Sequence, residues 1–438
     1  MFVDIRQYKK DCIHFIGCGG AGMFPLAIIL LEQGFRVSGS DMKSSSNTEI
    51  LISRGANIFI GHDGANIPSG QKTLVVYSSA VSAENPELVL ARSSNFVCLL
   101  RGEMLGSLSQ VYQRTVAISG SHGKTTVTGM LAHIMETCGV DAGYMIGGKL
   151  SGNDIPARAG NGDIFITEVD ESDGTHANMS CSIGLVTNVE CDHSWSVGGE
   201  QRLYANFQTF AEQSKQLIYV QSDKSDQLFA DHQNKEILSF TTISAKQNLP
   251  DVDASRLAEW GDYQRANASL AINAAVKLGI SRFDAERAMS SFAGVARRMS
   301  THYQNAVTVL IEDYAHHPTE VRVALSALRE RFPDFHLTVL FQPHRYARLE
   351  KYIEEFAYEL GKADSVFITP VFAAWVEKGL VDSADLVQLI GAKATEVSDE
   401  WHKTASVVLN TRYAKEIVAV FGAGTVNEVI PYILEKIK

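Results

Sequence analysis

Hydrophobic residues along the chain gather in short continuous runs, separated by longer stretches in which they recur at helical spacing. Apolar runs of about five residues, bounded by glycine or polar residues, are typical of strands buried on both faces of a parallel sheet. Helical stretches between such strands predict an α/β fold class. The clearest predicted strands are residues 12–16, 73–77, 163–168, 183–188, 307–311, 336–341, 365–369 and 417–421.

The length of the chain, 438 residues, exceeds what one hydrophobic core usually supports. The order of the predicted elements divides it into three α/β domains. We predict an N-terminal Rossmann-like domain over residues 1–110, a central P-loop ATPase-like domain over 111–300, and a C-terminal Rossmann-like domain over 301–438. We find no internal repeat and no low-complexity tract.

Residues 116–126 read Val-Ala-Ile-Ser-Gly-Ser-His-Gly-Lys-Thr-Thr and predict a strand, a tight turn and the start of a helix. Such a turn places backbone N–H groups and the positive end of the helix dipole around a phosphate. Lys124 is expected to reach the β- and γ-phosphates of a nucleotide, and the Thr125 hydroxyl to hold Mg²⁺. The alternative is a chance Gly-Lys-Thr in a loop. The predicted ATP-binding residues of the turn are Gly120, Ser121, His122, Gly123, Lys124, Thr125 and Thr126.

Acidic residues follow the predicted strand 163–168, which ends in Glu168 and leads into Asp170-Glu-Ser-Asp173. A carboxylate at a strand end beside a phosphate loop is a usual anchor for Mg²⁺. The alternative is a solvated acidic turn, but mutual repulsion of the acids favours a cation partner. His193 follows the next predicted strand and could be a metal ligand, a phosphate contact or a surface residue.

A second glycine-rich turn, Gly17-Cys-Gly-Gly-Ala-Gly22, follows the first predicted strand. With Asp41 at the end of the next strand, it has the dinucleotide-binding pattern, in which a diphosphate lies on a helix N-terminus. The pattern does not identify the nucleotide, and a turn without ligand is the alternative. An NAD(P)-dependent oxidoreductase is a further alternative, although the second phosphate site at 120–126 argues against it. Ser79 lies in a polar loop after the strand 73–77, at a position where α/β sheets commonly bind ligands.

Polar loops also end two predicted strands of the third domain, at residues 312–318 and 342–348. Arg345 and Arg348 are three residues apart, so a helix starting there would present both on one face. Arg297 and Arg298 suit phosphate binding, although surface ion pairs are the default for such residues. Asn267 lies on an alanine-rich predicted helix whose small residues are also explained by close packing.

The net charge of −11 and the absence of a Lys/Arg block argue against a general nucleic-acid or anionic-membrane binder. The six cysteines are scattered without a C-x-x-C pair, which is typical of reduced thiols in a cytosolic protein. Charged residues precede the first apolar run, so no signal peptide is expected.

Together these motifs make the chain resemble the Mur ligases, ATP-dependent amide-forming enzymes of peptidoglycan synthesis. The resemblance covers nearly the whole chain, and within the family it points to the alanine-adding branch. The motifs that carry it are Gly17-Cys-Gly-Gly-Ala-Gly-Met23, Ser38-Gly-Ser-Asp41, Gly120-Ser-His-Gly-Lys-Thr-Thr126, Glu168-Val-Asp-Glu-Ser-Asp173, Thr187-Asn-Val-Glu-Cys-Asp-His193, Asp313-Tyr-Ala-His-His-Pro-Thr-Glu320 and Gln342-Pro-His-Arg-Tyr346.

The resemblance implies a role for each site. Lys124, Glu168 and His193 would be catalytic, and Thr125, Glu168 and His193 would hold Mg²⁺. Asn267 and Arg298 would contact ATP together with the loop at 120–126. UDP-N-acetylmuramate would bind through Gly17, Gly19, Gly20, Gly22, Asp41 and Ser79. The sugar carboxylate and the amino acid would meet Tyr314, His316, His317, His344, Arg345 and Arg348.

The resemblance also implies the substrates UDP-N-acetylmuramate and L-alanine, ATP and Mg²⁺, and a cytoplasmic location in bacteria. We expect no nucleic-acid partner, no stable membrane association, and a monomer or homodimer. Two alternatives remain within the same fold. One is the sister ligase that attaches a recycled tripeptide to UDP-N-acetylmuramate, and the other is a non-catalytic binding protein.

Overall fold

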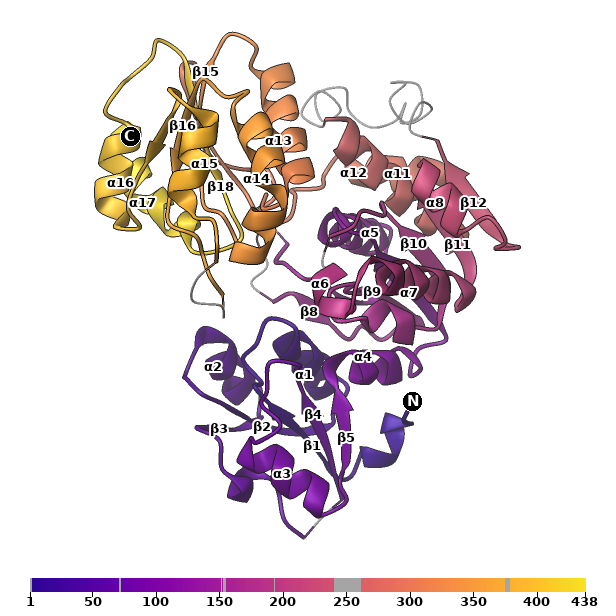
Figure 1. Ribbon diagram of the computed structural model, residues 1–438. Helices are drawn as coiled ribbons and strands as arrows, with labels where there is room; N and C mark the ends of the chain where they lie inside the picture. Colours follow the sequence, from indigo (N-terminus) through magenta and orange to yellow (C-terminus); the bar gives the residue numbers. More distant parts are fainter. Residues whose placement is uncertain are drawn as a thin grey trace. The chain divides into compact units, whose positions relative to one another are not determined.

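A computed structural model describes residues 2–70, 72–150, 152, 155–192, 194–239, 261–374 and 379–438. The chain divides into two compact units, Met1–Asp253 with Gln264–Ala293, and Ala254–Tyr263 with Gly294–Lys438. The first unit contains two β-sheets and the second contains a third (Figure 1). The predicted α/β fold class, with three largely parallel sheets, is confirmed. The domain boundaries near residues 110 and 300 remain predictions.

The first sheet has five parallel strands in the order β3-β2-β1-β4-β5. Its strands are β1 (Cys12–Ile16), β2 (Arg36–Asp41), β3 (Asn57–Ile60), β4 (Thr73–Tyr77) and β5 (Val97–Leu100). Its helices are α1 (Met23–Glu32), α2 (Ser46–Ser53), α3 (Pro86–Ser93) and α4 (Arg101–Ser109), with 3₁₀ turns η1 (Ile5–Tyr8) and η2 (Gly64–Asn66).

The central strand β1 is buried along its whole length, as its continuous apolar run predicts. The chain leaves β1 toward β2 on one side and later returns to β4 on the other. Ligands of open α/β sheets bind where the strand order reverses in this way, outside the carboxyl ends of the strands. The glycine-rich turn 17–22 and the loop carrying Ser79 follow β1 and β4, and therefore lie at this edge.

The second sheet has seven strands in the order β12-β11-β10-β6-β9-β7-β8, parallel except for the short pair β7–β8. Its strands are β6 (Arg114–Ser119), β7 (Gly143–Met145), β8 (Ala157–Arg158), β9 (Ile164–Glu168), β10 (Cys181–Val186), β11 (Ser214–Val220) and β12 (Lys235–Leu238). Its helical segments are α5 (Lys124–Thr137), η3 (Thr175–Asn178), α6 (Ser194–Val197), α7 (Glu200–Glu212), α8 (Asp223–Leu228), α11 (Asp262–Lys277) and α12 (Arg282–Met289).

The first two sheets share one continuous hydrophobic cluster, which runs from Ile5 to Phe229. Hydrogen bonds join the same two parts. The Glu32 carboxylate accepts from the Ala159 N–H at 2.7 Å, and the Gln33 amide donates to the Tyr112 hydroxyl at 2.9 Å. These contacts explain why the first two predicted domains form one compact unit.

The third sheet has six strands in the order β13-β14-β18-β15-β16-β17, with only β13 antiparallel to its neighbour. Its strands are β13 (Ser300–Gln304), β14 (Thr308–Asp313), β15 (His336–Phe341), β16 (Ser365–Ile368), β17 (Ala394–Glu396) and β18 (Glu416–Phe421). Its helical segments are α13 (Pro318–Arg331), α14 (Tyr346–Leu360), α15 (Ser383–Ile390), α16 (Trp401–Val408), η5 (Val426–Val429) and α17 (Ile430–Ile437).

Two element boundaries predicted from the sequence differ from the structure, each for a physical reason. The strand predicted to reach residue 188 ends at Val186, because the next two side chains turn to bond the loop after β6. The glycines at Gly422 and Gly424 in the sequence also predict the start of the last helix, but the helix does not open there. Gly422 has φ 152°, and the Val426 N–H donates to the Gln342 side chain, so that the helical backbone starts at η5.

Candidate active site

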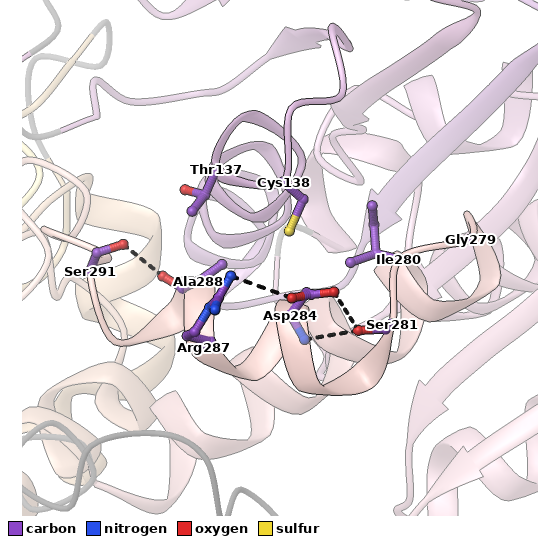
Figure 2. A pocket seen from close by; sticks show the side chains of 9 residues that line it. All are labelled: Thr137, Cys138, Gly279, Ile280, Ser281, Asp284, Arg287, Ala288 and Ser291. Carbon is purple, nitrogen blue, oxygen red and sulfur yellow. Dashed lines mark hydrogen bonds and ion pairs between the residues drawn. The ribbon is translucent and has the colours of Figure 1, made fainter.

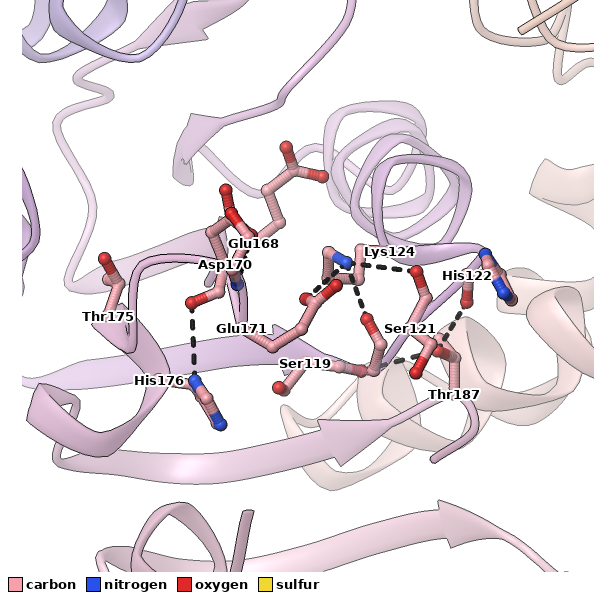
Figure 3. Close-up of polar contacts among 12 residues, drawn as sticks. Ser119, Ser121, His122, Lys124, Glu168, Asp170, Glu171, Thr175, His176 and Thr187 are labelled. Atoms are coloured by element: carbon pink, nitrogen blue, oxygen red, sulfur yellow. Dashed lines mark hydrogen bonds and ion pairs between the residues drawn. The ribbon is translucent and has the colours of Figure 1, made fainter. Parts of the chain in front are cut away.

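The loop after β6 wraps the N-terminus of α5, and two glycines make its path possible. Gly120 has φ 131° and Gly123 has φ 87°, both in the region that favours glycine. A Cβ added to Gly120 would overlap the Thr187 hydroxyl. The loop is therefore pressed against the residues that follow β10, as Figure 3 shows.

The side chains after β10 fix the loop by its backbone. The Asn188 amide accepts from the His122 N–H at 2.9 Å and donates to the His122 carbonyl at 2.9 Å. Thr187 donates to the same carbonyl at 2.6 Å, and the Ser121 hydroxyl accepts from the Glu190 N–H at 2.8 Å. This hydrogen bonding holds the loop in its curved form before any ligand arrives.

Lys124 points back across the loop that it follows (Figure 3). Its ammonium donates to the carbonyls of Gly120 at 2.6 Å and Ser121 at 3.3 Å, and to the Glu171 carboxylate at 2.6 Å. The lysine side chain is 15% exposed and that of Glu171 only 2%. The acidic segment was expected to have a cation as partner. For Glu171, that cation is Lys124.

Burial shifts the titration of this pair. It raises the pKa of Glu171 to about 7, although the charge of Lys124 acts in the opposite direction. Burial also acts to lower the pKa of Lys124, but the charges of Glu171 and Asp170 outweigh it and the pKa is raised. Lys124 thus remains a cation near neutral pH.

Thr125 and Glu168 form the oxygen pair that was predicted for Mg²⁺. The Thr125 hydroxyl donates to the Glu168 carboxylate at 2.8 Å, from the first turn of α5 to the end of β9. Gly147 leaves room for this carboxylate, because a Cβ there would overlap it. Hydroxyl and carboxylate oxygens are ligands that suit Mg²⁺. The third predicted ligand, His193, lies outside the described residues.

Asn267 on α11 lies against the same loop. A Cβ added to Gly123 would stand 2.8 Å from its side-chain oxygen, and its amide nitrogen donates to Gln264 at 3.3 Å. The structure thus brings the predicted Asn267 to the loop that carries Lys124. Arg298 belongs to the other compact unit, where it bonds Glu320 at 3.2 Å.

The glycine-rich turn of the first sheet is closed by Asp41. Its carboxylate accepts from the Gly19 N–H at 2.9 Å, while the Ser40 carbonyl accepts from the N–H groups of Gly17 and Cys18.

The loop after β4 borders this turn. Gly17 has φ 80°, and a Cβ added to it would lie 4.0 Å from Val81 in that loop. Ser79 is exposed in that loop. Gly20 turns the chain by accepting from Met23 and Phe24.

Aromatic and basic side chains cluster at the carboxyl ends of β14 and β15 in the second unit. His316 lies edge-on to Tyr314 and His344, with ring centroids 5.3 and 5.7 Å away, and the Arg348 guanidinium donates to the His344 carbonyl at 3.3 Å. Arg298 stacks over Tyr314 at 5.1 Å. These predicted residues therefore form one cluster.

Burial, opposed by the charge of Glu320, holds the pKa of His316 well below its usual value. The Nδ1–H of this neutral ring donates to the Tyr314 carbonyl at 2.8 Å, which leaves Nε2 as the nitrogen that can accept a hydrogen bond. Burial also raises the pKa of Asp313, at the end of β14, to about 6.

Two predicted residues near this cluster are placed differently. Arg345 is the residue before α14, with φ 68°, so Arg345 and Arg348 do not share a helical face as their spacing suggested. A left-handed residue breaks the helical periodicity on which that expectation depended. His317 caps α13 by accepting from the Thr319 N–H, and its ring packs on Tyr352 at 4.7 Å.

Comparison with known proteins decides the family. The sequence matches the Mur ligase family, catalytic domain, over residues 12–113, the Mur ligase middle domain over 118–274, and the Mur ligase, glutamate ligase domain over 297–424. The UDP-N-acetylmuramate–L-alanine ligase of Persephonella marina is 34% identical over 98% of both chains. The chain belongs to the Mur ligase family.

Solved structures agree with this Mur ligase fold. The UDP-N-acetylmuramate-alanine ligase of Thermotoga maritima superposes with a TM-score of 0.76 at 24% identity, covering 97% of this chain and 98% of that one. The murein peptide ligase of Psychrobacter arcticus gives a TM-score of 0.66 at 20% identity over the same shares. Mur ligases use ATP, which suits the loop that holds Lys124.

Several residues of this Mur ligase site were not predicted from its sequence. Glu171, Asn188 and Gly147 all contact predicted site residues. The signal for Glu171 and Asn188 was their place just beyond apolar strands, where ligand-binding loops occur. The residues around Gly147 in the sequence give no such signal, because a glycine is needed there to make room for Glu168, which lies on another strand.

A separate cavity of about 550 Å³ lies at the far end of α5 (Figure 2). Thr137 and Cys138 line it from the end of α5, and Ser281, Asp284 and Arg287 line it from the start of α12. At 1.5 Å per residue, the 14-residue helix separates it from the phosphate loop by roughly 20 Å. No predicted site residue lines this cavity.

The remaining general expectations concern cysteines and membranes. All six cysteines are free thiols. In the described part of the chain, no helix combines the length and apolar character needed to cross a membrane.

Proposed function

We propose that this Mur ligase joins L-alanine to the carboxylate of UDP-N-acetylmuramate, with ATP converted to ADP and phosphate. The observation that carries the proposal is the alignment, over nearly the full length, with ligases named for this reaction. The loop geometry supports the use of ATP, because Lys124 and the backbone of residues 120–123 surround the start of α5.

The proposed chemistry has two transfers. A carboxylate oxygen of the sugar attacks the γ-phosphorus, ADP leaves, and an acyl phosphate forms. The amine of alanine then attacks the acyl carbon, phosphate leaves, and the amine nitrogen loses a proton. Both steps build negative charge, which preorganised cations and N–H groups stabilise.

Residues of this chain have distinct tasks in that scheme. The loop N–H groups and Lys124 bind the phosphates, after Lys124 exchanges Glu171 for phosphate oxygens. Thr125 and Glu168, with His193 as the third predicted ligand, would hold Mg²⁺, which supplies charge stabilisation on phosphate oxygens. His316 is held neutral by burial, which keeps its pKa well below the usual value, so its Nε2 is able to accept a hydrogen bond from the incoming amine.

The binding sites for the other substrates are proposed from position and chemistry. UDP-N-acetylmuramate is assigned to Gly17, Gly19, Gly20, Gly22, Asp41 and Ser79, which lie at the reversal point of the first sheet. The cluster of Tyr314, His316, His344 and Arg348 suits a carboxylate and an amine. The state of assembly, monomer or homodimer, stays a prediction. A cytoplasmic location is supported by the two nucleotide substrates proposed.

The decisive experiment is a specificity assay of the full-length protein. ATP-dependent phosphate release is measured with UDP-N-acetylmuramate and, separately, L-alanine, glycine, L-serine or the tripeptide L-Ala-γ-D-Glu-meso-diaminopimelate. Turnover with L-alanine at the highest kcat/KM is expected. Turnover with the tripeptide alone would assign the chain to the sister activity, which the higher TM-score to the alanine ligase disfavours.

A further inference from the structure

Glu171 is a buried carboxylate that depends on the lysine of the ATP loop for its charge compensation. The Lys124 ammonium bonds it at 2.6 Å, and the Glu171 side chain is only 2% exposed. Among the described residues, no other side chain donates a hydrogen bond to this carboxylate. A carboxylate that is buried in this way keeps its charge only while a cation remains beside it.

The Lys124 ammonium has no hydrogen to spare for a further acceptor. It donates to the carbonyls of Gly120 at 2.6 Å and Ser121 at 3.3 Å, and to Glu171 (Figure 3). An ammonium has three donors, so a phosphate oxygen binds to it only if one of these acceptors is released. The two carbonyls belong to a loop that is held in place by the side chains after β10. Glu171 is therefore the acceptor that a phosphate replaces.

This exchange leaves Glu171 among negative charges. The charged and titratable groups around the pair are Lys124 from α5, Asp170 from the same segment as Glu171, Glu168 from β9 and His176 from η3. Burial raises the pKa of Glu171 to about 7 even while Lys124 is bonded to it. Loss of the lysine and arrival of phosphate charge both act to raise that pKa further. The pKa of His176 is lowered by burial to about 4, so this ring stays neutral above pH 7.

We propose that ATP binding draws Lys124 away from Glu171, and that Glu171 then takes up one proton from the solvent. The hydrogen bond to the ammonium breaks, a proton from water or buffer adds to a carboxylate oxygen, and Lys124 keeps its charge. This inference rests on the proposed function and deepens its ATP site. Glu171 is thus a positioning residue, which holds Lys124 before ATP arrives and becomes neutral afterwards.

The sign of the pH dependence follows from the two states. At pH 8, about nine in ten molecules of the free protein carry a charged Glu171, so binding takes up about one proton. Because protons are taken up on binding, nucleotide affinity falls as the pH rises above 7. Well below pH 7 the carboxylate is already protonated in the free protein, and the uptake disappears.

Titration calorimetry of the full-length protein counts these protons. The magnesium complex of a non-hydrolysable β,γ-imido analogue of ATP is titrated at pH 8 in HEPES, Tricine and Tris, which differ in ionisation enthalpy. The slope of the observed enthalpy against the ionisation enthalpy of the buffer gives the number of protons taken up. Wild type is expected to take up about one proton per nucleotide, and to lose about five- to tenfold in affinity between pH 7.5 and pH 8.5.

Glu171→Gln should abolish the proton uptake and give an affinity that does not change between these pH values. Asp173→Asn is the matched control, since Asp173 lies in the same acidic segment but pairs with Arg101 and not with Lys124. It should keep the proton uptake of wild type. An equal uptake in wild type and Glu171→Gln, or an equal loss in both variants, would overturn the proposal.

Infrared difference spectroscopy of wild type decides the question if Glu171→Gln does not fold. Binding of the analogue should create the C=O band of a protonated carboxyl group, shifted in heavy water, and its absence would overturn the inference. A wild-type protein that does not bind the analogue would refute the ATP site of the proposed function. Binding without proton uptake would refute only this inference, because Lys124 would then serve phosphate and Glu171 together.

Discussion

At the residue scale, the pair formed by Lys124 and Glu171 affects both phosphate binding, as proposed, and the stability of the folded protein. Both side chains are nearly buried, and each compensates the charge of the other. Removing one partner of such a pair leaves a buried charge without compensation, which is usually more costly than removing both. The cation that we propose to be catalytic is therefore also a structural one.

We predict that Lys124→Ala lowers kcat by roughly a hundredfold to a thousandfold, because a preorganised cation on the transferred phosphate is lost. It should also lower the free energy of unfolding at pH 8 by roughly 3–5 kcal/mol, since the buried Glu171 loses its compensating cation and must either stay charged or take up a proton on folding. Steady-state phosphate release and denaturant unfolding measure the two effects.

The double variant Lys124→Ala/Glu171→Gln is the control for that prediction. It should recover most of the lost stability while activity stays low, because no charge remains to be compensated. Recovery of turnover in the double variant, or an equal loss of stability in both proteins, would contradict the roles assigned to this pair.

His176 gives a second prediction at this scale. The residue is fully buried, and its Nδ1 bonds the Asp170 carbonyl at 3.3 Å (Figure 3). Burial lowers the pKa of His176 from 6.5 to about 4. The unfolded chain therefore binds a proton between these pH values that the folded protein does not, so stability falls as the pH drops from about 6.5 to 4.

We expect His176→Asn, which keeps a donor for the Asp170 carbonyl, to remove that part of the pH dependence. Relative to wild type, the variant should gain up to roughly 3 kcal/mol of unfolding free energy between pH 7 and pH 4. Urea unfolding at several pH values measures the difference, in which the contribution of Glu171 cancels. Parallel curves for the two proteins would show that His176 does not titrate as proposed.

At the scale of elements, the strand–turn–helix units place the chemistry. β6, β9 and β10 are adjacent, so that the loops after them meet at one edge of the second sheet. The turn after β6 has little conformational freedom, because Gly120 combines a positive φ with contact to Thr187. A side chain at this position would overlap the Thr187 hydroxyl and would strain the backbone.

Gly120→Ala should therefore destabilise the protein by at least about 3 kcal/mol and abolish binding of a non-hydrolysable ATP analogue. Gly139→Ala is the matched control. Gly139 follows the same helix with φ 76°, but no atom lies within 4 Å of its added Cβ. It should cost only about 1 kcal/mol through backbone strain and leave nucleotide affinity unchanged. Thermal melting and calorimetric titration of both variants test this, and similar losses of affinity would contradict it.

For the whole molecule, the division into two compact units predicts the unfolding behaviour. The first two sheets share a hydrophobic cluster and the contacts of Glu32, Gln33 and Arg101. We expect calorimetry to resolve two transitions, one for each unit, and not three. UDP should raise the midpoint of only one transition, since all residues proposed to bind it lie in the first unit.

A substitution in the core of the second unit assigns the transitions. Leu340 is fully buried in the third sheet, and Leu340→Ala should lower the other midpoint while the UDP-sensitive one stays fixed. A single cooperative transition, or a UDP effect on both, would show that the units do not unfold independently.

Sequence alone determined the local features of this protein. The strand limits at 12–16, 73–77 and 336–341 were predicted as observed, because a buried parallel strand requires a continuous apolar run. The loop at 120–123 and the turn at 17–22 were also readable, because tight turns that approach a phosphate require glycine. These features depend on neighbours within a few residues, and the family followed from their combination.

Tertiary structure decided which side chains meet. Glu171 lies 47 residues from Lys124, and Asp173 lies 72 from Arg101, yet each pair is in contact. Strand order brings them together, and strand order is set by the packing of whole sheets, not by spacing along the chain. For the same reason Gly102 and Gly147 appeared as ordinary glycines until the side chains that fill their missing Cβ positions were seen. The prediction that Arg345 and Arg348 share a helical face was wrong because Arg345 has a positive φ in the turn that leads into α14. The spacing of the two residues does not reveal that turn.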